Sequence, residues 1–113
     1  MSFAIDKEER GMYYLITITG DFNVKSLRIL RQTLEEAMDI GHIYIAFDLK
    51  NTETIDSGGI GVLMNMNTKL VAKGGAVFLT GVPSGIRPTL ETAGLLSTIA
   101  CLKSVEEADQ SIG

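Results

Sequence analysis

The sequence predicts an α/β protein with a mainly parallel five-stranded sheet, one antiparallel edge strand and about four helices. Three observations lead to this prediction. Apolar β-rich segments alternate with segments of helical period, the first two segments are both of strand type, and glycines follow most segments. Alternating strands and helices favour right-handed crossovers and a parallel sheet. The 113 residues contain no repeat or linker, so we expect a single domain spanning 1–113.

The first two segments predict a β-hairpin. Residues 12–19 are rich in aromatic and β-branched side chains and end at Gly20. Residues 3–8 can pair with them in antiparallel orientation across a turn near Arg10 and Gly11. This hairpin supplies the antiparallel edge strand.

Helical periodicity begins at Leu27, where apolar side chains start to recur on one stripe with charged side chains opposite them. Asn23 or Ser26 can cap this helix, and Gly41 can end it. Residues 43–49 are nearly all apolar, as expected for a strand that is covered on one or both faces.

The second half of the chain repeats this alternation. Residues 50–54 are expected to form a polar loop that leads into a second helix, which ends near Lys73 and turns Ile60, Leu63, Leu70 and Val71 inward. The remaining predicted elements are a buried strand at 76–80, a helix at 87–93, a short strand at 98–102 and an acidic helix at 105–112.

The segment 55–61, with the sequence Ile-Asp-Ser-Gly-Gly-Ile-Gly, is the local pattern that suggests a function. Ser57 is expected at the N-cap of the second helix, where its hydroxyl can accept a backbone N–H. Gly58 and Gly59 each cost about 1 kcal/mol relative to Ala in a helix. Bare backbone beside an exposed hydroxyl would let another macromolecule approach closely, although a plain cap and a tight turn would explain the same residues.

Composition excludes several other classes of function. The net charge of −4 argues against nonspecific nucleic-acid binding and against docking on an anionic membrane. One cysteine and one histidine leave no basis for a Cys-based zinc site, and no cofactor motif is present. A chymotrypsin-like serine-protease interpretation of 56–59 fails, because that enzyme class needs a histidine base, an orienting Asp and two barrels, and the chain is far too short for them. We therefore expect a cytoplasmic protein that is not an enzyme, without cofactor, metal, nucleic-acid contact or membrane insertion.

Segments over nearly the whole chain resemble the STAS domain family, the domain of anti-sigma factor antagonists and of sulfate-transporter tails. The matching segments are Phe3-Ala4-Ile5, Thr19-Gly20-Asp21, Phe47-Asp48-Leu49, residues 55–61, Lys73-Gly74-Gly75 and Thr92-Ala93-Gly94-Leu95. The family motif runs Asp-Ser, then a small residue, Gly, Leu or Ile, and Gly. Two positions differ from the pattern: Gly58 replaces the usual Ser or Thr, and Asn23 stands where antagonists often carry an Asp.

This resemblance implies an anti-sigma factor antagonist. In that role an anti-sigma factor serine/threonine kinase binds the unphosphorylated form and phosphorylates it on Ser57, and a serine phosphatase restores the active form. Asp56 falls on the acid that precedes the phosphorylated serine. The expected partner-binding residues are Asp21, Asn23, Thr54, Ile55, Asp56, Ser57, Gly58, Gly59, Ile60, Gly61, Val62 and Met66.

Two further expectations concern this surface. Val62 and Met66 could form an exposed apolar patch beside the serine turn, whereas Met64 is expected to be buried under a neighbouring helix. The alternative function is that of an unphosphorylated STAS scaffold subunit in a transporter or signalling assembly. A kinase assay separates the two functions, because a scaffold would gain no phosphate on Ser57.

Overall fold

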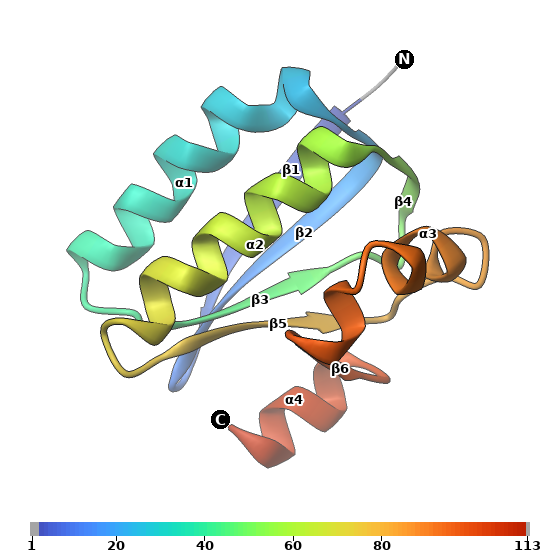
Figure 1. Ribbon diagram of the computed structural model, residues 1–113. Coiled ribbons are helices and arrows are strands. Elements are labelled where there is room, and N and C mark those ends of the chain that lie inside the picture. Colours follow the sequence, from blue (N-terminus) through green and yellow to red (C-terminus); the bar gives the residue numbers. More distant parts are fainter. Residues whose placement is uncertain (1–2, 113) are drawn as a thin grey trace.

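The computed structural model describes residues 3–112, which form a layered α/β arrangement around one mixed sheet (Figure 1). The described elements follow one another as β1 (Phe3–Arg10), β2 (Tyr13–Phe22), the 3₁₀ turn η1 (Val24–Ser26), α1 (Leu27–Asp39), β3 (Tyr44–Asp48), β4 (Thr52–Ile55), α2 (Ser57–Val71), β5 (Ala76–Thr80), α3 (Arg87–Thr92), the 3₁₀ turn η2 (Leu95–Ser97), β6 (Ala100–Leu102) and α4 (Val105–Ser111).

The sheet confirms the predicted class and contains six strands, one more than expected. Its main path runs β1-β2-β3-β5-β6; the β1–β2 pair is antiparallel and every other pair within residues 3–112 is parallel. The additional strand β4 includes residues 52–54 of the stretch that we expected to be a polar loop, and continues to Ile55. It pairs with the last residues of β2, which continues past Gly20 to Phe22.

Strand β4 was missed because its sequence is short and mostly polar, so that pairing rather than side-chain pattern makes it a strand. Thr52 and Ile55 are buried in it, while the two residues between them are exposed. The Thr52 hydroxyl donates a hydrogen bond to the Ile18 carbonyl at 2.8 Å. This contact holds the start of β4 against β2 and thereby positions the residues that lead into α2.

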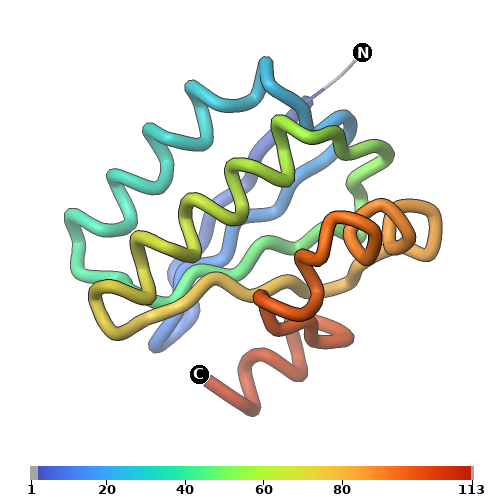
Figure 2. Tube along the Cα trace, viewed as in Figure 1, coloured from blue at the N-terminus to red at the C-terminus, as the bar shows by residue number. Residues whose placement is uncertain are grey.

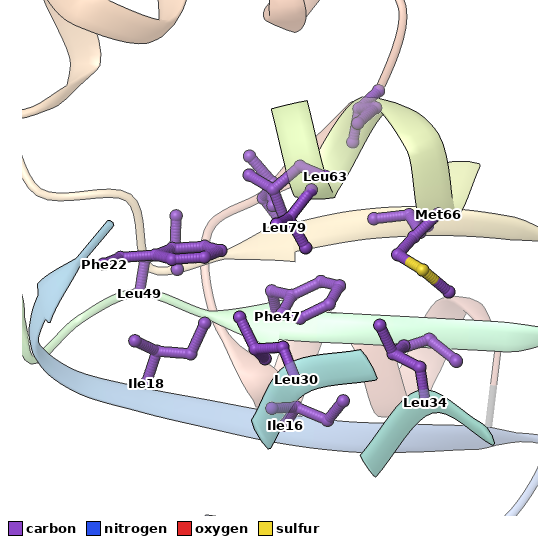
Figure 3. Packing of buried hydrophobic residues seen from close by; sticks show 14 of the residues in the cluster. Ile16, Ile18, Phe22, Leu30, Leu34, Phe47, Leu49, Leu63, Met66 and Leu79 are labelled. Carbon is purple, nitrogen blue, oxygen red and sulfur yellow. The ribbon is translucent and has the colours of Figure 1, made fainter. Parts of the chain in front are cut away.

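Helices α1 and α2 lie side by side over one face of the sheet, and α4 lies on the opposite face (Figures 1 and 2). Beneath α1 and α2, their leucines pack on sheet residues such as Ile16, Ile18 and Phe47 (Figure 3). A smaller apolar cluster on the other face holds Tyr13, Leu15, Ala46, Phe78 and Ala108. No helix within residues 3–112 has the length and apolar character that a bilayer crossing requires.

Several local expectations change in the structure. Val71 is 55% exposed rather than turned inward, because it lies at the last position of α2 on the outer side. Met64 is half-buried. Asn23 caps the 3₁₀ turn η1 and not α1 itself, with the Lys25 N–H donating to its side chain at 2.9 Å.

Candidate partner-binding site

The serine turn lies between β4 and α2, beyond the carboxyl end of a parallel strand. Asp56, not Ser57, is the N-cap: its carboxylate accepts a hydrogen bond from the Gly59 N–H at 3.0 Å. Ser57 is therefore the first residue of α2, and its side chain is exposed with no hydrogen-bond partner within residues 3–112. The predicted cap was wrong by one residue, because Asp competes with Ser for the same backbone N–H.

This shift matters chemically, because the serine hydroxyl is released from a capping role. A capping hydroxyl would be committed to a backbone N–H, whereas the Ser57 hydroxyl is available to a reagent from solvent. The neighbouring Asp56 carboxylate is held at the start of the helix by the Gly59 N–H. A negative charge is thus fixed beside a free hydroxyl.

A second carboxylate is held next to this turn by the pairing of β2 with β4. Asp21 is buried, and its Oδ1 accepts a hydrogen bond from the Thr54 hydroxyl at 2.7 Å. The same two residues are register partners in the parallel β2–β4 pair. Through this contact Asp21 lies beside Thr54, which precedes Ser57 by three residues in the chain.

The two glycines after Ser57 make room for this chain's own backbone, which is a structural reason for them besides the predicted approach of a partner. A Cβ on Gly59 would lie 2.6 Å from the Phe22 carbonyl oxygen, and one on Gly58 would lie 2.9 Å from the Val24 nitrogen. Gly58 therefore replaces the family's Ser or Thr at a place where η1 passes close by. By contrast, a Cβ on Gly61 would meet no atom within 4 Å.

The turn that presses on Gly58 is itself held by a capping box. The Asn23 backbone N–H donates to the Ser26 hydroxyl at 3.3 Å, and the Asn23 side chain accepts from Lys25. Asn and Asp cap about equally well. Asn23 thus keeps the local geometry while removing the negative charge that an Asp would add there.

Val62 and Met66 are not an exposed patch, because their accessible fractions are 7% and 6%. Both belong to the main apolar cluster and lie beside Leu27 and Leu34 of α1, so the predicted patch is wrong. Ile55 is buried and Ile60 half-buried. The surface of the turn is therefore mainly that of Thr54, Asp56 and Ser57, which are all exposed.

Reasoning from the sequence missed the part that η1 plays at the site. Val24 is 58% exposed and its backbone touches the position of Gly58. The available signal was the spacing of Asn23 and Ser26, which is that of a capping box. Within residues 3–112, no group of three or more His, Cys, Asp or Glu side chains is placed to hold a metal ion.

A mixed sheet with helices on both faces and a serine turn beyond its carboxyl edge defines the class as a small α/β domain. The model of the STAS domain matches residues 4–108, and the chain belongs to this family. The resemblance that the sequence motifs indicated is thereby confirmed.

Known relatives agree with this assignment. An anti-sigma F factor antagonist of Paenibacillus polymyxa is 24% identical over 96 residues, which make up 84% of this chain and 82% of the relative. The crystal structure of an anti-sigma factor antagonist from Mycobacterium paratuberculosis superimposes with a TM-score of 0.85 at 17% identity, covering 98% of this chain and 94% of that one. The phosphorylated form of the Bacillus cell-fate determinant SpoIIAA gives a TM-score of 0.71 at 19% identity, covering 96% and 98%. At these identities the structural likeness shows the fold alone.

Proposed function

We propose that this chain is an anti-sigma factor antagonist that binds an anti-sigma factor serine/threonine kinase and is released when the kinase phosphorylates Ser57. The observation that carries this proposal is the exposed, uncommitted Ser57 hydroxyl beside the fixed Asp56 carboxylate. The curated relative named as an anti-sigma F factor antagonist supports it. In this proposal the protein acts in the cytoplasm as a binding protein without catalysis of its own, and a serine phosphatase restores it.

In the free protein, the start of α2 can accommodate a phosphate on Ser57. A phosphoserine carries a charge of about −1.5 to −2 at neutral pH. At the first helical position it would meet the positive end of the α2 dipole, which favours an anion by about 0.3–1 kcal/mol. Since Ser57 is exposed, the phosphate would also remain hydrated. We therefore expect phosphorylation to leave the fold intact.

The electrostatic free energy of the phosphate becomes unfavourable when a partner covers the turn. The Gly59 N–H is already bonded to Asp56, so that donor is not free for the phosphate. Two unit charges about 4 Å apart repel by about 1 kcal/mol in water and by about 4 kcal/mol at a partly desolvated protein surface. A loss of a few kcal/mol lowers affinity by about a hundredfold or more. Repulsion at the covered turn can thus release the partner without refolding.

The direct test is phosphorylation by the anti-sigma factor kinases encoded in the same genome, each purified and supplied with ATP. Intact-mass measurement should show one phosphoryl group on the wild type and none on Ser57→Ala. The matched control is Ser84→Ala, which removes another exposed serine and should leave the modification unchanged. Phosphate on the Ser57→Ala protein would contradict the assignment of the site.

Binding to the same kinase tests the consequence of the charge. We expect Ser57→Ala to bind as the wild type does and Ser57→Asp to bind about tenfold or more weakly, because the carboxylate supplies part of the phosphate's charge. Equal binding by the two variants would contradict release by repulsion. Binding without any phosphorylation would instead favour the scaffold function.

A further inference from the structure

A cleft of about 230 Å³ lies between α1 and α2, on the outer surface of these helices. Its floor is apolar and is formed by Leu27 and Leu34 of α1 with Val62 and Met66 of α2. Figure 3 shows Leu34 and Met66 on their separate helices above the sheet. The residues of each helix recur at spacings of three, four or seven, so they share one helical stripe facing the neighbouring helix.

The rim of the cleft carries positive charge from both helices. Arg31 of α1 and Lys69 of α2 line the cleft together with Asn65, and all three side chains are exposed. Within residues 3–112 neither cation forms an ion pair, as is true of every Lys and Arg there except Lys7, Arg10 and Lys50, so both are available to a partner's carboxylates. Two unpaired cations flank an apolar floor in a chain whose net charge is −4.

The size of the cleft indicates what it can hold. Pockets for small molecules and cofactors usually occupy about 300–1,000 Å³. At about 230 Å³ this cleft lies below that range. It suits one large apolar side chain whose backbone stays outside, where neighbouring carboxylates can reach the two cations.

The cleft lies near the serine turn along the axis of α2. Val62 follows Ser57 by five residues in α2, which is about 7.5 Å along a helix axis. A partner of ordinary interface size, about 800 Å² on each side, would cover both features at once.

We propose that the cleft between α1 and α2 receives an apolar anchor side chain of the partner protein, flanked by partner carboxylates that pair with Arg31 and Lys69. This inference rests on the proposed function, since it names how the kinase partner is recognised. A buried anchor in a pocket supplies most of the affinity of such an interface. Charges on the rim mainly set the association rate and its dependence on salt.

Charge reversal tests the flanking carboxylates. Arg31→Glu and Lys69→Glu should each weaken binding to the anti-sigma factor kinase about tenfold and reduce the dependence of the association rate on salt. The matched controls are Arg28→Glu and Lys73→Glu. They make the same change on exposed residues that do not line the cleft, and should bind as the wild type does.

Filling the cleft tests the anchor. Asn65→Phe places a ring over the floor from an exposed position, and should weaken binding by about tenfold or more by excluding the partner's side chain. Thr68→Phe adds the same ring to an exposed position of α2 outside the cleft and is the control. Thermal melts of both variants verify that each is folded, and a folded Asn65→Phe with full affinity overturns the proposal.

The outcomes separate this inference from the function on which it rests. Full affinity of Arg31→Glu and Asn65→Phe, with weak binding of Ser57→Asp, overturns the cleft and leaves the switch standing. Weak binding of the cleft variants with equal binding of Ser57→Ala and Ser57→Asp supports the cleft and contradicts the switch. Occupation by decanoate or by a second copy of this chain, with partner affinity unchanged in the cleft variants, overturns the proposal; nuclear magnetic resonance and light scattering detect these two cases.

Discussion

The two faces of the sheet are stabilised in different ways. The face under α1 and α2 buries a large apolar cluster that includes leucines from both helices, from Leu30 to Leu70. The opposite face is covered by α4, a helix of 7 residues whose one fully buried side chain is Ala108. A helix this short has little stability of its own and buries little apolar area.

On the face covered by α4, polar contacts add to the small apolar area that is buried there. Arg10 of the β1–β2 hairpin pairs with the Asp109 carboxylate of α4, donating through Nη2 and, at 3.0 Å, through Nε. The Tyr13 hydroxyl donates to the same carboxylate at 2.7 Å. The bonds from Arg10 and Tyr13 lower the pKa of Asp109 to about 2, and burial with the bond to Asp109 raises the pKa of Tyr13 to about 12. One face is thus held by burial, and the other is oriented by a charged hydrogen-bonded group.

The largest difference should appear when an apolar side chain is truncated on each face. Leu63→Ala removes a fully buried side chain of α2, and we expect it to lower the free energy of unfolding by about 2–5 kcal/mol. Val105→Ala on the α4 face removes a half-buried side chain and should cost less. Urea denaturation measures both values, and equal losses would contradict the comparison of the faces.

Gly59 and Gly61 of α2 test how closely this helix packs on the face with the larger apolar cluster. Gly59→Ala pushes a methyl group against the Phe22 carbonyl, and the displacement should cost about 1–3 kcal/mol of unfolding free energy. Gly61→Ala makes the same change in the same helix without a collision, and should stabilise by up to about 1 kcal/mol. Thermal melts show whether each variant is less or more stable than the wild type. Destabilisation of similar size by both would show that the Phe22 contact is not the cause.

The smallest expected effect on stability is that of Asp109 on the α4 face, and it depends on pH. The pKa of Asp109 falls from 3.8 to about 2 on folding, so its contribution to stability is present above pH 3.8 and is lost as the pH falls toward about 2. Asp109→Asn should reduce stability at neutral pH and remove this component of the acid sensitivity. Urea midpoints at neutral and acidic pH measure it, with Glu106→Gln on the exposed side of α4 as control. A variant with the wild-type pH profile would contradict the role of Asp109.

The fold was predictable because its signals are local. Alternating strand and helix periods, and glycines after several elements, identify five of the six strands and all four α-helices. The motif around Ser57 and the segments that resemble the STAS family likewise lie in short stretches of chain. Strand β4 was not predictable, because its four residues are mostly polar and lack a strand pattern of their own, so that only the pairing with β2 makes them a strand.

The sequence by itself determined the order of the elements, the family and the placement of Ser57 at the start of a helix, because periodicity and motif spacing act over a few residues. Only the tertiary structure decided which of two neighbouring residues caps α2, and that Gly58 and Gly59 make room for η1 and β2. It also placed Val62 and Met66 beside Leu27 and Leu34 of α1. Whether a side chain is buried, and how closely two backbones approach, depends on the element packed against it, and that element comes from a distant part of the chain.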